Sequence, residues 1–318
     1  MTAPTRAVGP AHVIMALATF VSMVIAQTPR RAGESLWQLL IGWPADPARL
    51  LPALPFAATL MAVLLAHELG HMAAARAVGA PLPPPWLIPA PMFFFGTLGA
   101  VIPSRGPMPD RSSLLRMALA GPLAGLLVAL PAAVWGLHHS TQLADQVAHG
   151  QAGMMLGDSL LFAACERWFA PGGGEVILHP VALAAWAGLF FTSLNLLPIG
   201  QLDGGHVVYA LNRRLHRIMG RGVLVLLILL GLGGAVRGDG AQAWWVWALL
   251  LAVMGLGHPQ VAQPARPLAG GDRRLACLAL LLWLATFVPV PVRQVAYVDA
   301  ATDPPLVPGD EAGEEIRL

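Results

Sequence analysis

Charged residues are scarce in this sequence. They make up 11% of its 318 residues, against about 25% in an ordinary soluble domain. Lysine is absent, so all 19 basic residues are arginine, while 56% of the chain is hydrophobic. This composition excludes an ordinary soluble protein and predicts an integral membrane protein. The net charge of +2 is too small and too dispersed to indicate nucleic-acid binding, so we expect no nucleic-acid partner.

Cysteine is nearly absent as well. Only Cys165 and Cys277 occur, far apart and without a C-x-x-C spacing. Two such residues cannot form a disulfide framework or a thiolate zinc site by themselves. We expect both to pack as small apolar side chains.

Long uncharged runs dominate the rest of the chain. A membrane-spanning helix needs about 20 apolar residues, and seven segments are predicted to provide one helix each. They are residues 7–29, 50–78, 117–144, 176–202, 222–236, 241–257 and 275–292. The first has a poor signal-peptide cleavage site, so we interpret it as a retained helix. The expected fold is an all-α polytopic membrane protein with about 6–7 transmembrane helices.

Residues 77–104 are also uncharged, but they do not have the pattern of a helix. The segment contains seven prolines, and proline breaks a helix interior. Its second half, MFFFGTLGAVI, is rich in strand-forming residues. Irregular backbone at membrane depth survives only where protein or a watery cavity covers it. We therefore predict a re-entrant β-hairpin or loop, with an eighth, kinked spanning helix as the alternative.

The placement of arginine predicts the orientation and the division of the chain. Cytoplasmic loops carry an excess of basic residues, and the clusters RRLHRIMGR and GDRR face the cytoplasm only if the proline-rich segment does not cross. This supports the re-entrant alternative. The expected parts are a first helix and loop (1–49), an intramembrane core (50–210), further helices (211–295) and a disordered acidic tail (296–318).

The motif HELGH, residues 67–71, ends the second apolar run. Residues four apart share a face of a helix, so His67 and His71 can bind one ion with Glu68 beside it. In this H-E-x-x-H arrangement, two histidines bind zinc and the glutamate is a general base. Zinc lowers the pKa of a bound water to about 7, and the carboxylate takes its proton. Because ionisable groups are costly inside a membrane, we predict one zinc ion here.

A catalytic zinc site needs a third protein ligand and one open position. Asp203, in NLLPIGQLDGGH, follows a long uncharged run, and the two glycines after it allow a close backbone approach. The predicted helices before the two motifs run in the same direction, so both motifs reach the same membrane depth. His206 is the competing candidate. His216 and His258 are expected to lie in solvated loops.

Together these motifs resemble those of the site-2 proteases, the intramembrane zinc metalloproteases of peptidase family M50. HELGH is similar to the family's first motif and NLLPIGQLDGGH to its second. The resemblance implies His67, His71 and Asp203 as zinc ligands and Glu68 as catalytic base. It also implies cleavage of transmembrane protein substrates within the bilayer, often after another protease has trimmed them.

The segment FFFGTLGAVI looks like the family's membrane-associated strand. This implies that the extended substrate lies along Phe95, Gly96, Thr97, Leu98 and Gly99. An exposed strand edge there could hold an unwound substrate by strand addition. The alternative for the phenylalanines is packing against lipid.

Three further residues of the core have an expected role. Asn195 is implied by the resemblance to help stabilise the oxyanion, and an amide can donate the hydrogen bond that this requires. It could equally pack between helices or cap the backbone. Gly121 and Gly125, in AGPLAG, are expected to permit a close helix contact.

Two other functions fit parts of the pattern. A zinc-binding membrane scaffold or transporter would not need Glu68 as a base, and no internal repeat of the transporter kind is visible. A prenyl-protein protease needs a glutamate as third ligand, and the later glutamates are all predicted on the far side. We therefore expect an intramembrane zinc protease, surrounded by lipid in a bacterial inner membrane, with its active site toward the cytoplasm.

Overall fold

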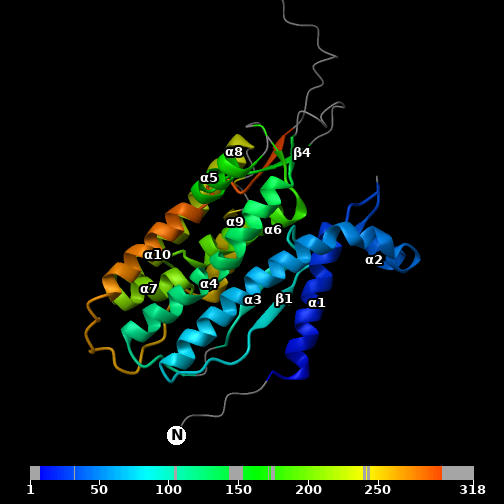
Figure 1. Cartoon of the computed structure of the whole chain (residues 1–318). Helices are drawn as coiled ribbons and strands as arrows, with labels where there is room; N and C mark the ends of the chain where they lie inside the picture. The colour runs from blue at the N-terminus through cyan, green and yellow to red at the C-terminus, as the bar shows by residue number, and fades with distance from the viewer. Residues whose placement is uncertain are drawn as a thin grey trace, which may run out of the picture.

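The computed structural model describes residues 8–31, 33–103, 106–142, 153–170, 172, 176–238, 241 and 244–295. This part of the chain is mostly helical (Figure 1). The helices are α1 (Pro10–Gln27), α2 (Leu36–Gly42), α3 (Leu54–Ala77), α4 (Arg111–His138), α5 (Leu160–Phe169), α6 (Pro180–Asn195), α7 (Asp203–Leu211), α8 (Arg213–Arg237), α9 (Trp244–Met254) and α10 (Asp272–Thr286), with the 3-10 helices η1 (Trp43–Ala45) and η2 (Pro47–Ala53) before α3.

Three two-stranded antiparallel sheets accompany the helices in the described ranges. They pair β1 (Trp86–Pro89) with β2 (Thr97–Val101), β3 (Thr141–Gln142) with β5 (Val176–Ile177), and β4 (Gly153–Leu156) with β6 (Val292–Val295). The fold is therefore mostly helical, as expected for a helical protein with one β-hairpin, but two of its three strand pairs were not predicted. The β3–β5 and β4–β6 pairs are too short to show an alternating pattern in the sequence. The predicted disordered tail, 296–318, lies outside the described residues.

Four helices of the described chain are long and apolar enough to cross a membrane: α1, η2 continued by α3, α4 and α8. This agrees with the predicted membrane protein. The apolar helices α6 and α9 have 16 and 11 residues, and α10 has 15. These are shorter than the about 20 residues that a spanning helix needs, so the count of 6–7 spans stays a prediction.

Three helices, α4, α8 and α10, begin earlier than the uncharged runs indicated. α4 begins at Arg111 because the Asp110 carboxylate accepts a backbone hydrogen bond at 2.8 Å and caps the helix. α8 begins at Arg213 because Asn212 caps it in the same way. The limits predicted for α8, 222–236, were too narrow, because the first turn of a helix can carry arginines that lie outside the apolar part of the membrane.

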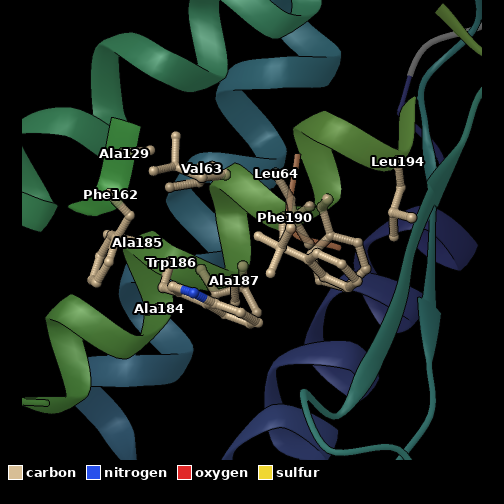
Figure 2. Close-up of a cluster of buried hydrophobic side chains, with 14 of the residues drawn as sticks. Val63, Leu64, Ala129, Phe162, Ala184, Ala185, Trp186, Ala187, Phe190 and Leu194 are labelled. Atoms are coloured by element: carbon tan, nitrogen blue, oxygen red, sulfur yellow. The ribbon is translucent and has the colours of Figure 1, made fainter. Parts of the chain in front are cut away.

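The core forms where α3, α4 and α6 are in mutual contact (Figure 1). Figure 2 shows part of its buried cluster, in which Trp186 and Phe190 of α6 lie near Val63 and Leu64 of α3. The Trp186 and Phe190 rings are stacked with their centroids 5.5 Å apart. Inside a membrane no hydrophobic effect drives helices together, so close packing of this kind is what stabilises their contacts. It also fixes the half of α3 that precedes the HELGH motif.

The proline-rich segment forms a β-hairpin rather than a kinked helix. Trp86 of β1 lies opposite Val101 of β2, and Pro89 lies opposite Thr97. The hairpin lies between α1 and α3 (Figure 1). An eighth spanning helix is therefore excluded for this segment, while entry of the hairpin into the membrane stays a prediction.

We expect Gly96→Ala, in the hairpin turn, to destabilise the protein more than Gly79→Ala, after α3. Both glycines have φ +73°, a conformation that costs a side chain roughly 1–2 kcal/mol. Only at Gly96 would a Cβ also overlap the backbone of Met23 in α1, which we expect to cost a further ~1–3 kcal/mol. The measurement is the melting temperature of each variant in detergent. Equal melting temperatures would contradict the close contact between hairpin and α1.

Candidate metal centre and its cavity

Three side chains from two distant parts of the chain meet at one point. His67 and His71 lie one turn apart on α3, and Asp203 is the first residue of α7. Nε2 of His67 is 3.2 Å from one carboxylate oxygen of Asp203, and Nε2 of His71 is 3.3 Å from the other. All three side chains are buried. The structure thus brings together the three residues predicted as zinc ligands, and among the described residues they form a group that could hold a metal ion, which we call the metal-binding group.

The donor atoms of this group fit a zinc ion. Zinc takes tetrahedral nitrogen and oxygen ligands at about 2.0–2.1 Å, which places neighbouring donors about 3.3 Å apart. The two Nε2 atoms are 3.0 Å apart, close to this spacing. Nδ1 of His71 donates to the carbonyl oxygen of Met117 at 2.8 Å. The Nε2 lone pair of a neutral His71 ring is therefore left to bind the metal.

Glycines let α4 approach the metal-binding turn of α3. At Gly121, a Cβ would overlap the His71 ring. One turn farther along α4, a Cβ at Gly125 would lie 3.4 Å from Cβ of His67. The close helix contact predicted from AGPLAG is confirmed. The absence of a side chain at Gly121 leaves room for the ring of His71.

We expect Gly121→Ala to weaken zinc binding by roughly 10–100-fold, the usual effect of disturbing a group that orients a ligand. Gly125→Ala is the matched control, since its added methyl group meets His67 only at the ordinary contact distance given above. Zinc bound per chain would be measured by elemental analysis during dialysis against increasing chelator. Equal zinc retention in the two variants would count against this account of the site.

The turn between α6 and α7 delivers Asp203 to the site. α6 ends at Asn195, and α7 begins eight residues later. At Gly204, a Cβ would overlap the carbonyl group of Leu196, so only glycine permits this approach. The close backbone approach predicted from the two glycines is confirmed.

Glu68 lies beside the ligands, about 100° around α3 from His67. Its side chain is buried and lines the cavity next to the metal centre. Within the described ranges, no hydrogen bond or ion pair holds its carboxylate. Its oxygens are therefore available to a group bound in the cavity, such as a water molecule.

A cavity of about 370 Å³ opens next to the metal-binding side chains. Its wall includes the end of β2, segment 106–108, the turn between α6 and α7, and segment 255–261. A smaller cavity of about 50 Å³ lies between α3, α6 and β2. His67, Glu68 and Ala100 line both cavities. β2 therefore lines these two cavities along most of its length.

The structure divides the five residues predicted to contact substrate. Leu98 and Gly99 line the smaller cavity together with the HELGH motif. Phe95 packs against three aromatic rings of α6, and Gly96 lies against α1. Thr97 is buried, and its hydroxyl donates to a carbonyl oxygen of β1 at 2.9 Å. Only the second half of the predicted set therefore faces the reaction site directly.

The phenylalanines of this segment do not share one environment. Phe93 and Phe94 are exposed, as the lipid-facing alternative requires, whereas Phe95 is only partly exposed and belongs to the core.

Asn195 lines both cavities. Its amide nitrogen is 3.4 Å from Nε2 of His67, so the side chain reaches the metal centre. An amide at this position can donate a hydrogen bond to a group bound at the metal. Its part in catalysis stays a prediction.

A second histidine pair, His206 and His258, lines the larger cavity. The contact between these two residues was not predicted from the sequence. Nδ1 of His206 is 2.7 Å from Nε2 of His258, and Nδ1 of His258 donates to the carbonyl oxygen of Pro259 at 2.5 Å. Burial lowers the pKa of His258 to about 4. The expectation that His216 lies in a solvated loop is wrong, since it lies on α8 and is 2% exposed. His258 lies in a loop, as expected, and is partly exposed. No spacing in the sequence links α7 to the segment after α9.

Known proteins resemble this chain over the part that forms the site. A model of peptidase family M50 matches residues 55–232. The chain is similar to the "Probable zinc metalloprotease EGY1, chloroplastic" of Arabidopsis thaliana, at 34% identity over 65% of this chain and 38% of that protein. It is also similar to the "Probable zinc metalloprotease EGY2, chloroplastic" of the same plant, at 30% identity over 76% of this chain and 42% of that protein. The aligned part thus spans less than half the length of these relatives. No solved structure matches the chain.

Proposed function

We infer, because this chain belongs to peptidase family M50, that it is an intramembrane zinc metalloprotease. The observation that carries the proposal is the buried group of His67, His71 and Asp203, with the buried Glu68 carboxylate beside it at a cavity. The apolar helices around this group support a substrate that is itself a transmembrane segment.

The side chains of the site account for peptide hydrolysis. A bound zinc ion would activate water and polarise the substrate carbonyl. Glu68 takes one proton from the attacking water and then delivers it to the nitrogen of the leaving amine, so the peptide C–N bond is exchanged for a C–O bond. Asn195 can donate to the carbonyl oxygen as negative charge develops there.

Substrate binding along β2 follows from the position of this strand. The amides of a helix are satisfied within the helix, so a transmembrane substrate must unwind before attack. β2 pairs with β1 through one edge, and no other strand of the described chain pairs with it. An unwound segment can add to the other edge, which brings it past Leu98 and Ala100 to the metal centre.

The arginine distribution supports a site that opens toward the cytoplasm. Segment 255–261, in the cavity wall, leads into the stretch that contains Arg266, and Arg266 forms an ion pair with Asp110 at the start of α4. We propose that six or seven helices cross the membrane and that this arginine-rich side faces inward. The relatives named above are described as chloroplastic plant proteins. They give no support to a bacterial inner membrane, which stays a prediction.

The test compares membrane proteomes of cells carrying the wild type and Glu68→Gln. If the proposal holds, a membrane protein accumulates in the variant as a stub trimmed on one side, and purified wild type cleaves that stub. This result would also support the proposed partner, a transmembrane protein already cut by another protease. Identical membrane proteomes would contradict the proposed function.

A further inference from the structure

The turn of the β1–β2 hairpin is bonded to α1, a helix outside the region that the family model matches. The Ser22 hydroxyl donates to the carbonyl oxygen of Gly96 at 2.6 Å and accepts from the amide of Ala90 at 3.0 Å. The Gln27 amide donates to the carbonyl oxygen of Phe94 at 2.6 Å. Ser22 is buried. One hydroxyl group therefore joins α1 to both sides of the hairpin turn.

Among the described residues, apolar contacts hold the opposite side of the turn. The Phe95 ring lies 5.5 Å from Phe191, 6.0 Å from Trp186 and 6.2 Å from Phe190 on α6, measured between ring centroids. Apolar packing has little directional preference, whereas hydrogen bonds require close distances and near-linear angles. The hydrogen bonds to α1, together with the close contact between Gly96 and Met23 of that helix, therefore fix the position of the turn along the strand direction.

A shift of the turn would pass directly into the reaction site. Gly96 is followed at once by β2, and Leu98, Gly99 and Ala100 line the cavity that also contains Glu68. Strand residues are spaced by about 3.4 Å. A substrate that pairs with β2 would therefore present a neighbouring peptide bond to the metal centre if β2 moved by about one residue.

We propose that Ser22 is a positioning residue that sets the register of the substrate along β2 and so determines which peptide bond is cleaved. The proposal rests on the proposed protease function. Ser22 acts through Ala90 and Gly96 and does not contact the substrate. It extends the specificity-determining part of the molecule to α1.

The experiment uses Ser22→Ala and two matched controls, Thr19→Ala and Thr28→Ala. Both threonines are buried, Thr19 on α1 and Thr28 directly after it, but their hydroxyls donate to carbonyl oxygens of α1 itself, at 2.8 and 2.7 Å. The probe is a single-span model peptide in detergent micelles, rich in leucine and alanine, with a central Asn–Gly pair that weakens its helix. The readouts are kcat and KM separately, the masses of the products, and zinc per chain.

We expect the wild type to cleave one main bond and Ser22→Ala to spread cleavage over adjacent bonds. Its kcat/KM should fall about tenfold, the usual effect of losing a buried hydrogen bond, with zinc unchanged. The threonine variants should match the wild type in all readouts. A merely structural role for Ser22 would lower the amount of folded enzyme without changing the product masses.

Two outcomes separate this inference from the proposed function. Wild-type product masses and wild-type kinetics for Ser22→Ala would overturn the inference alone. A purified wild type that cleaves neither the peptide nor any membrane protein would contradict the protease function. If Ser22→Ala does not fold, Ser22→Cys replaces the hydroxyl with a thiol, which is only a weak donor and acceptor, and an unchanged product pattern in that variant overturns the inference.

Discussion

Replacing Glu68 with glutamine is expected to abolish peptide hydrolysis while the protein keeps its zinc. The amide has nearly the shape of the carboxylate but cannot take a proton from the attacking water. General acid–base catalysis contributes roughly 10²–10⁴-fold to a rate, so turnover should fall by about 10³-fold. Zinc should remain because Glu68 is not part of the metal-binding group.

The measurement pairs turnover of the model peptide with zinc bound per chain. Glu166→Gln is the matched control, because Glu166 lies on α5 and lines neither cavity at the metal centre. It should keep both wild-type values. Full turnover by Glu68→Gln would eliminate the proposed mechanism. It would favour a zinc-binding scaffold, whose function needs no base.

The grouping of His67, His71 and Asp203 could be predicted because these residues belong to two short motifs, each of which can be interpreted from its own sequence. His67 and His71 lie within one helical turn, so the spacing alone places both rings on one face of α3. Asp203 needed a second argument, which combined its place after an uncharged run with the close approach permitted by the glycines beside it. The structure confirms that approach at Gly204. In both cases, a local rule of backbone geometry carried the prediction.

Contacts between distant segments could not be predicted in the same way. Ser22 contacts a turn 74 residues later, and His206 contacts a residue 52 positions later. A serine on an apolar helix or a histidine beside a proline has no spacing that reveals such a partner. These contacts depend on how the helices pack, and the hydrophobicity pattern defines the helices without defining their neighbours.

The helix starts that were misplaced show a different cause. Asn212 is a good N-cap residue, but the uncharged run from which α8 was predicted begins only after the arginines. The arginines belong to the helix because their long side chains can extend toward water while the backbone stays helical. Capping residues were thus better markers of helix starts than the loss of charge.

The second large effect concerns the identity of the third zinc ligand. Asp203→Asn is expected to reduce zinc affinity by at least about 10²-fold, because a neutral amide is a poor substitute for a carboxylate in a zinc site. Activity should be lost with the metal. His206→Asn, three residues along α7, introduces the same side chain and should keep its zinc. Its imidazole is bonded to His258 and lies outside the metal-binding group.

Thermal melting tests this assignment without relying on activity. A metal that binds only the folded state stabilises it by about 2.7 kcal/mol at a concentration 100 times its Kd. Wild type and His206→Asn should therefore melt at a higher temperature with zinc than with chelator, while Asp203→Asn should show no difference. The reverse pattern would identify His206 as the ligand.

The stabilisation should also be located where the metal joins two elements. His67 and His71 lie on one helix, so a metal held by them alone would leave the packing of α7 unaffected. A metal that also binds Asp203 links α3 to the start of α7. Hydrogen exchange of the α7 amides should therefore slow on zinc addition in the wild type and in His206→Asn. In Asp203→Asn the α7 amides should exchange at the same rate with and without zinc, because the link is missing.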